Sequence, residues 1–166
     1  MSVTPQRQQR VDFPESYMTI GQTILLAGAH SGSVGSFRDL DDPGYKVASK
    51  PGTTGEVAVR TLIPNASYSP FDTETEGAMA VLNGEVDAFV YDLPFNAVFM
   101  AMHDGTDLIF LDEPFTSEHL AWAIRKDDPD FQAWLNRFLA ELRADGRYQR
   151  YYEKWFKRRD WFAYVR

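Results

Sequence analysis

Residues 45–56 read YKVASKPGTTGE, and this stretch shows the pattern that repeats through the middle of the chain. Its first five residues, YKVAS, include aromatic and β-branched side chains and predict a short strand. Gly52 opens a turn, and Thr53 stands three residues before Glu56, which is the spacing of a helix capping box. The stretch therefore predicts a strand that ends in a turn and leads directly into a helix.

Strand and helix signals continue to alternate on both sides of this stretch. Thr73 and Glu76 repeat the capping-box spacing ahead of a second helix, which is expected to end at Asn83-Gly84. A third helix is expected at 93–103, and further strands are expected at 23–27, 86–91, 108–111 and 120–124. Alternation over about 80 residues predicts an α/β sandwich with a largely parallel sheet.

The last third of the chain has a different pattern. Asp128-Pro129 is a typical helix start. Large apolar residues then recur at helical spacing at Phe131, Trp134, Leu135, Phe138, Leu139 and Leu142. After Gly146 the same spacing continues at Tyr148, Tyr151, Tyr152, Trp155 and Phe156. We interpret both stripes as core-facing helix surfaces, which need something to pack against.

The composition excludes several classes of function. The 166 residues are 44% hydrophobic and 25% charged, which fits one globular domain or two small lobes. The net charge of −7 argues against general binding of nucleic acid or anionic lipid. The absence of cysteine excludes disulfides and thiolate chemistry. We expect no metal and no cofactor, because the three histidines lie far apart and the glycines lack phosphate-binding spacings.

Two local features are candidates for binding a small charged ligand. The turn at 52–55 presents backbone N–H groups and the hydroxyls of Thr53 and Thr54, which together suit a carboxylate. Helix capping alone would also explain Thr53. Asp92 directly follows the strand expected at 86–91, and ligands usually lie at the carboxyl ends of such strands. Its carboxylate could hold an ammonium group or merely cap the next helix.

Taken together, the segments resemble the periplasmic amino-acid-binding proteins of ABC importers, which form family 3 of the bacterial solute-binding proteins. The matching segments follow the order of that family over nearly the whole chain, at 2–7, 11–17, 21–22, 50–55, 71–74, 83–92, 144–148 and 152–156. No export signal or membrane-spanning run is recognisable in the chain. The resemblance nevertheless implies a periplasmic location and membrane subunits of an ABC transporter as partners.

The resemblance implies a fold of the periplasmic-binding-protein type, in which two lobes close on the ligand. Residues 1–22 would be a remnant of the first lobe, and 23–124 would hold two hinge strands and a complete α/β second lobe. Residues 125–166 would be C-terminal helices of the first lobe. Relative to the family, half of the first lobe is missing, so the aromatic stripes would be exposed. We therefore expect a homo-oligomer, in which segments can be exchanged between chains.

The resemblance also implies roles for individual residues. A guanidinium would clamp the ligand α-carboxylate with paired bonds, the 52–55 turn would bind the same carboxylate, and one acid would hold the α-ammonium. A serine contact and a lysine that reads the ligand side chain in some relatives complete the set. In this order, the implied ligand-binding residues are Arg7, Thr53, Thr54, Asp92, Ser2 and Lys50.

The function implied by the resemblance is binding of an amino acid or similar zwitterion for uptake, without chemistry. Two alternatives remain open at this point. Dehydratases acting on cyclohexadienyl substrates share the fold, and such an enzyme needs a general acid, for which Asp92, Glu74 and His119 are the candidates. A sensory or interaction module could instead keep the fold without a ligand.

Overall fold

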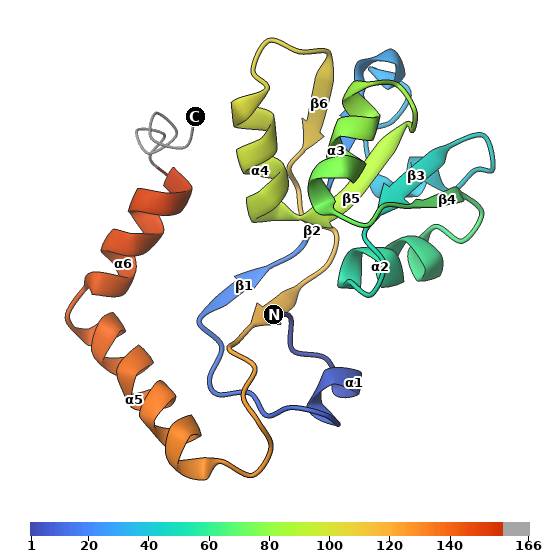
Figure 1. Cartoon of the computed structure of the whole chain (residues 1–166). Coiled ribbons are helices and arrows are strands. Elements are labelled where there is room, and N and C mark those ends of the chain that lie inside the picture. Colours follow the sequence, from blue (N-terminus) through green and yellow to red (C-terminus); the bar gives the residue numbers. More distant parts are fainter. Residues whose placement is uncertain (158–166) are drawn as a thin grey trace. The chain divides into compact units, whose positions relative to one another are not determined.

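The computed structural model describes residues 1–157 of the chain (Figure 1). The chain divides into two compact units. Unit 1 comprises Met1–Thr19 and Glu118–Arg166, and unit 2 comprises Ile20–Ser117. Residues 158–166, at the end of the predicted C-terminal segment, lie outside the described part. The lobe boundaries predicted from the sequence stay a prediction.

Unit 2 is built on a five-stranded sheet with the strand order β4-β3-β5-β2-β6. Its strands are β2 (Gln22–Ala27), β3 (Lys46–Ser49), β4 (Ser67–Pro70), β5 (Ala88–Asp92) and β6 (Leu108–Leu111). Strand β3 pairs in parallel with β4 and β5, whereas β2 pairs antiparallel with β5 and β6. Four strands therefore share one direction, and β2 alone is reversed. The prediction of a largely parallel sheet missed this reversal, because only short 3₁₀ turns and loops, and no crossover helix, connect β2 to β3.

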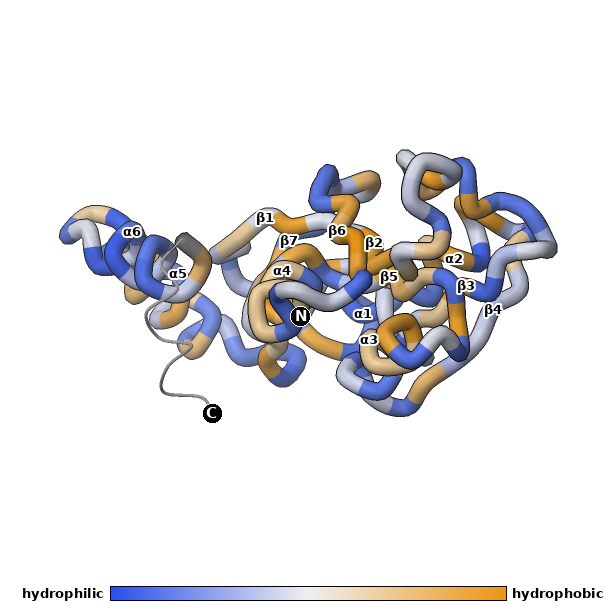
Figure 2. The backbone as a smooth tube through the Cα atoms, turned by 90° about the horizontal axis from the view of Figure 1, so that it is seen from above, coloured by the Kyte–Doolittle hydropathy of each residue, from blue (hydrophilic) through white to orange (hydrophobic). Residues whose placement is uncertain are grey.

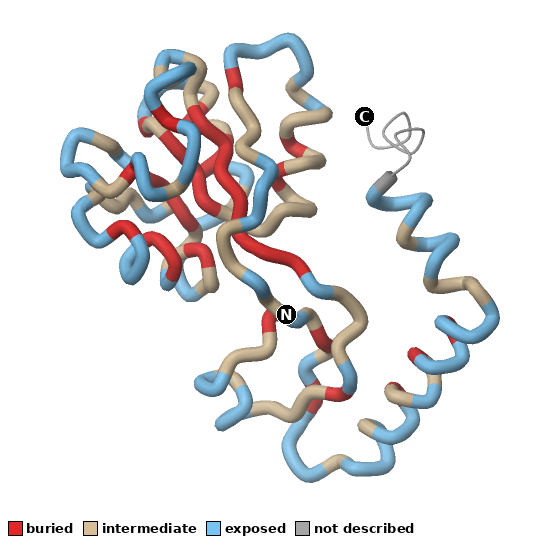
Figure 3. The backbone as a smooth tube through the Cα atoms, turned by 180° about the vertical axis from the view of Figure 1, so that it is seen from behind, coloured by how far each residue is buried: buried red, intermediate tan, exposed pale blue. Residues whose placement is uncertain are grey.

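Three helices cover the two faces of this sheet. They are α2 (Thr54–Leu62), α3 (Glu74–Leu82) and α4 (Leu93–Met102). On one face Ile24 and Leu26 of β2 form a buried cluster with Val59 of α2. On the other face Leu25 joins Val81 of α3 and Phe99 of α4. Alternate residues of β2 thus serve opposite faces, and the hydrophobic and buried residues follow the central strands (Figures 2 and 3).

The local signals in unit 2 predicted most of these elements correctly. The side chains of Thr53 and Thr73 accept hydrogen bonds from the backbone at the starts of α2 and α3, as their spacings predicted. Strand β5 begins two residues later than expected, because the N–H groups of Glu85 and Val86 still donate to the carbonyl of Ala80 at the end of α3.

Unit 1 contains the N-terminal segment and the C-terminal helices. Its elements are α1 (Pro5–Gln8), β1 (Met18–Ile20), β7 (Glu118–Leu120), α5 (Pro129–Ala144), α6 (Arg147–Tyr152) and the π-helical turn η3 (Glu153–Lys157). The strand predicted at 120–124 was wrong beyond Leu120, which is the last residue of β7. Ile124 forms an isolated bridge with Asp12 and belongs to no strand. Within residues 1–157 no helix is long and apolar enough to cross a membrane.

The aromatic stripe on α5 is only partly buried within the chain. Leu135, Leu139 and Leu142 are buried, as expected of a core-facing surface. In contrast, Phe131 and Trp134 are 44% and 53% exposed. Trp134 stacks on Phe138 with a centroid distance of 5.6 Å. The leucines therefore confirm the predicted packing face, whereas the core interpretation was wrong for Phe131 and Trp134, because spacing does not show what covers a face.

Candidate functional site

Polar residues gather at one edge of the sheet in unit 2. Lys50 directly follows β3, Glu74 begins the helix after β4, and Asp92 is the last residue of β5. These three strands are parallel neighbours, so their carboxyl ends meet at the same edge. Gln22 begins the reversed strand β2 and pairs in register with Asp92. This edge is where open α/β sheets usually bind ligands.

A buried glutamine joins two of the predicted site residues. The side chain of Gln22 is fully buried, and its Nε2 donates to Oδ1 of Asp92 at 2.6 Å and to Oγ1 of Thr54 at 3.3 Å. The structure therefore brings Thr54 and Asp92 together through one side chain. Sequence reasoning missed this role, because Gln22 entered it only as part of the matching segment 21–22.

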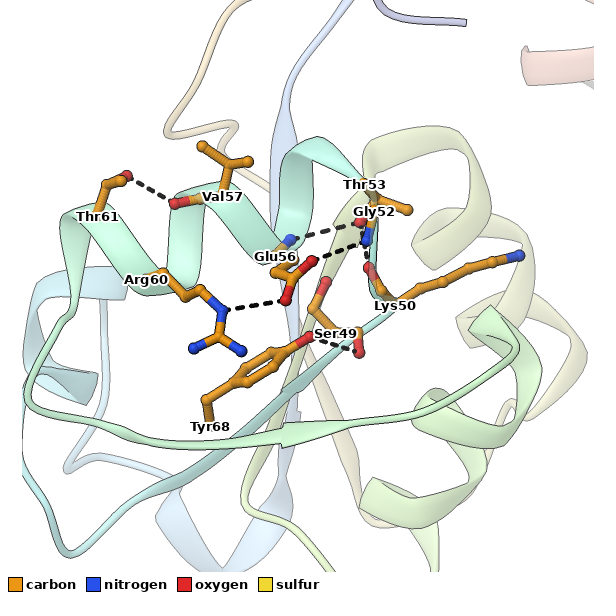
Figure 4. Close-up of polar contacts among 9 residues, drawn as sticks. All are labelled: Ser49, Lys50, Gly52, Thr53, Glu56, Val57, Arg60, Thr61 and Tyr68. Atoms are coloured by element: carbon orange, nitrogen blue, oxygen red, sulfur yellow. Dashed lines mark hydrogen bonds and ion pairs between the residues drawn. The ribbon is translucent and has the colours of Figure 1, made fainter.

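The two threonines of the turn have different hydrogen-bonding roles. The hydroxyl of Thr53 donates to the carbonyl of Lys50 at 2.7 Å and accepts the N–H of Glu56 at 3.4 Å (Figure 4). Its proton is therefore used inside the turn. The hydroxyl of Thr54 instead accepts from Gln22, which leaves its proton available to a ligand. Thr53 acts as the helix cap, and Thr54 is the better candidate for a direct ligand contact.

A charged network fixes the glycine of this turn (Figure 4). Glu56 accepts the N–H of Gly52 at 2.8 Å and the Nε–H of Arg60 at 3.0 Å. These contacts, with that from Gly52 the largest, lower the pKa of Glu56 from its ordinary value. The guanidinium of Arg60 lies 4.3 Å from the ring centroid of Tyr68. Burial, with the nearby charge of Glu56, raises the pKa of Tyr68 to about 12. At neutral pH the carboxylate of Glu56 is therefore ionised and the phenol of Tyr68 is neutral.

The first turn of α2 packs closely on the strand ends. A Cβ atom at Gly55 would lie 2.6 Å from Oγ of Ser49 and 2.9 Å from both Oε1 of Gln22 and the carbonyl oxygen of Val90. Ser49 is itself fully buried and donates to that carbonyl at 2.9 Å. Only glycine fits here, and it places the N-terminus of α2 directly beside Gln22.

Lys50 is held by an acid from the neighbouring strand end. Its Nζ lies 2.7 Å from Oε2 of Glu74, and each side chain is about one third exposed. The hydrogen bond from Lys50, followed by a backbone hydrogen bond of Glu74 itself, lowers the pKa of Glu74. The two residues stand 24 positions apart in the chain, and sequence reasoning did not pair them.

The remaining two predicted site residues belong to unit 1. Arg7 lies in α1, and its Nη1 donates to the carbonyl of Ser2 at 2.9 Å. Ser2 is buried and forms a bridge with Leu120. The hydroxyl of Thr4 accepts the N–H of Arg7 at 3.2 Å and caps this short helix. The backbone of the N-terminal segment thus orients the guanidinium.

Comparison with known proteins identifies the protein family of this chain. Residues 1–158 match the family described as bacterial extracellular solute-binding proteins, family 3. The chain belongs to this family. Structures of its members share the fold: a putative ABC-transporter binding component from Wolinella succinogenes, complexed with lysine, is 42% identical with a TM-score of 0.93. That match covers 98% of this chain and 70% of the other.

Three further binding proteins are also similar to most of this chain. The glutamine-binding protein GlnH of Bacillus subtilis is 30% identical over 95% of this chain and 56% of its own length. The glutamate-binding protein GluB of Corynebacterium efficiens is 28% identical over 90% of this chain and 52% of its own length. An ancestral amino-acid-binding protein, described as a precursor of cyclohexadienyl dehydratase, is 40% identical with a TM-score of 0.86, over 94% of this chain and 66% of the other. The chain thus spans about half the length of its curated solute-binding relatives.

Glu74, one of the residues considered for an enzyme, lacks the raised pKa of a general acid. A general acid that works near neutral pH needs a raised pKa, whereas the pKa of Glu74 is lowered. His119 lies in β7 of unit 1 and contacts the hydroxyl of Thr19 at 3.1 Å. Among the described residues, no group of three or more His, Asp or Glu side chains could hold a metal ion.

A cavity of about 510 Å³ elsewhere in unit 2 contains none of the predicted site residues. It lies beside β6, and its lining includes Phe37, Arg38, Leu111 and Phe115. Phe37 and Phe115 stack there with a centroid distance of 4.6 Å. The cavity is therefore separate from the polar edge, which remains the candidate ligand site of this solute-binding protein.

Proposed function

We propose that the chain binds an amino acid or similar small zwitterion as the ligand-binding component of an ABC importer, without chemical conversion. The observation that carries this proposal is the buried Gln22, which ties the Thr54 hydroxyl to the Asp92 carboxylate at the ligand-binding edge of the sheet. A donor and an anion held side by side match the two ends of a zwitterion.

Each end of the ligand finds a chemical complement in this arrangement. The Asp92 carboxylate accepts hydrogen bonds from the α-ammonium group, and charge-assisted bonds of this kind are stronger than neutral ones. The Thr54 hydroxyl and the N–H groups of the first turn of α2 donate to the α-carboxylate, which the helix dipole also favours. Thr53 supports this binding as the helix cap rather than through its own hydroxyl.

The resemblance implies further roles for Arg7 and Ser2, which belong to unit 1. A guanidinium binds a carboxylate through two parallel hydrogen bonds, so the carboxylate-binding role that the resemblance implies for Arg7 fits its chemistry. The carbonyl of Ser2 accepts a hydrogen bond from Arg7 and thereby orients it. Through the resemblance, Ser2 is also proposed to lie near the α-ammonium group.

The relatives support binding of the amino-acid backbone by a common set of groups. Their names refer to glutamine, glutamate, histidine and arginine, so side-chain preference varies within the family. Membrane subunits of an ABC transporter as partners, and a periplasmic location, follow from the same family membership as proposals. A dehydratase is not favoured, because the relatives are named as binding proteins and the pKa of Glu74 is lowered.

Titration of the full chain with each of the twenty amino acids tests this function. We expect at least one to bind in calorimetry and to raise the melting temperature, since a ligand present at 100 times its Kd stabilises the folded state by about 2.7 kcal/mol. Absence of binding to every amino acid at millimolar concentration would contradict the proposal. Turnover of a cyclohexadienyl acid would instead show an enzyme.

We also propose that the chain associates with itself through the aromatic surface of α5. Phe131 and Trp134 are large, apolar and about half exposed, and such surfaces are usually covered by a partner. Light scattering of the full chain should therefore report more than one chain per particle. Trp134→Glu should shift the distribution toward the monomer, whereas Arg125→Glu, at a side chain that is 82% exposed, should not. A monomer at all concentrations would refute self-association.

A further inference from the structure

The strand order places three charged residues in a row along the polar edge. Asp92 ends β5, Lys50 follows β3, and Glu74 follows β4, and these strands are successive neighbours in the sheet. Adjacent strands lie about 4.8 Å apart, so the strand ends span roughly 10 Å. The turn that carries Thr54 belongs to the middle strand, because it connects β3 to α2.

If the proposed function holds, the ends of β5, β3 and β4 offer three positions to a bound amino acid. The α-ammonium lies at Asp92, beside the end of β5, and the α-carboxylate lies at Thr54, after β3. The end of β4, with Glu74 and its partner Lys50, remains for the side chain. A side chain as short as that of alanine ends near Cα and does not reach this third position.

We propose that Glu74 is a specificity-determining residue, which together with Lys50 binds the polar end of a long ligand side chain and sets its charge preference. The pair has hydrogen-bonding capacity left for this role. Lys50 carries three N–H donors, of which one is directed at Glu74, and Glu74 keeps Oε1 as a further acceptor beside the bonded Oε2.

Because Lys50 and Glu74 carry opposite charges, removing one charge at a time tests the proposal. In the intact pair each charge offsets the other, so neither a cationic nor an anionic side chain meets a single uncompensated charge. Removing the charge of Lys50 leaves Glu74 to attract cations, and removing the charge of Glu74 leaves Lys50 to attract anions. Since both side chains are about one third exposed, the fold depends little on this ion pair.

The experiment compares Lys50→Met and Glu74→Gln in the full chain. Calorimetric competition against the tightest ligand gives the affinities for lysine and for glutamate, and their ratio is the readout. We expect the ratio of lysine to glutamate affinity to rise about tenfold in Lys50→Met and to fall about tenfold in Glu74→Gln. Alanine should bind the unaltered chain at least about tenfold more weakly than its tightest ligand.

Two control variants make the same charge changes at the opposite edge of the sheet. Lys46 begins β3, Glu85 lies between α3 and β5, and both side chains are exposed. Lys46→Met and Glu85→Gln should leave the affinity ratio within about twofold of the unaltered chain, because the charges lie farther from the ligand and are screened. Circular dichroism of all four variants checks that each one folds.

The outcomes separate this inference from the proposed function. If amino acids bind but the ratio does not move in opposite directions, or moves as much in the controls, the role of Glu74 is refuted while amino-acid binding stands. Equal affinity for alanine and the tightest ligand also refutes it, because the third position would then make no contact. If no amino acid binds the unaltered chain, both proposals fail.

Discussion

Asp92→Asn should strongly weaken amino-acid binding by the full chain. Asparagine keeps the shape of the side chain and an Oδ1 that can still accept the hydrogen bond from Gln22 Nε2. It removes the negative charge that we propose to hold the α-ammonium group. A charge-assisted hydrogen bond contributes roughly 1.5–3 kcal/mol, so the affinity should fall by about 10- to 150-fold in calorimetry.

A second acid near the same edge provides the control for Asp92→Asn. Asp72 is exposed, follows β4 and precedes α3. Asp72→Asn removes one negative charge without touching the contacts of Gln22, and its Kd should stay within about threefold of the unaltered value. Equal binding by Asp92→Asn and the unaltered chain would show that Asp92 does not hold the ammonium group.

Gly55→Ala should strongly destabilise the chain and weaken ligand binding at the same time. The new Cβ atom would lie 2.6 Å from Ser49 Oγ and 2.9 Å from the carbonyl oxygen of Val90. That backbone oxygen belongs to the central strand β5 and cannot rotate away, so α2 has to move. Added volume in a packed site typically destabilises by about 1–3 kcal/mol, which urea unfolding followed by circular dichroism can measure.

Gly35→Ala is the matched control for this substitution. Gly35 is exposed, and the atom nearest to a Cβ added there, Oδ2 of Asp39, would lie 3.9 Å away. The same chemical change should therefore alter the free energy of unfolding by less than about 0.5 kcal/mol. Equal stability of Gly55→Ala and Gly35→Ala would show that the first turn of α2 has room beside the strand ends.

Local sequence signals predicted the helices α2 and α3 of unit 2 well, because the start of each carries its own side-chain cap. The side chains of Thr53 and Thr73 accept hydrogen bonds from the helix backbone as their spacing required. Such signals could not predict the reversed direction of β2, since the direction of a strand depends on how it is connected and paired. The apolar residues at 120–124 resembled a strand, but only Leu120 lies in β7, and Ile124 pairs with the distant Asp12 at an isolated bridge.

The candidate site was predictable in type but not in detail. The turn chemistry and the position of Asp92 indicated an anion-binding and a cation-binding group, and the family resemblance assigned their roles. Thr53 is the helix cap and Thr54 the candidate ligand contact because of their hydrogen bonds to Lys50 and Gln22, respectively. These contacts between distant residues were not predictable. Glu74 meets Lys50 only because β3 and β4 are neighbours in the sheet, which no local pattern encodes.

The contacts of Glu56 have a consequence for how ligand preference can diversify. Its bonds to Gly52 and Arg60 immobilise the turn within unit 2 itself, so its loss of conformational entropy accompanies folding and not ligand capture. The proposed binding of the ligand backbone by this turn therefore does not depend on which side chain the ligand carries. Substitutions at the neighbouring strand ends can then change the selectivity for the ligand side chain one residue at a time, while the proposed binding of the ligand backbone is retained.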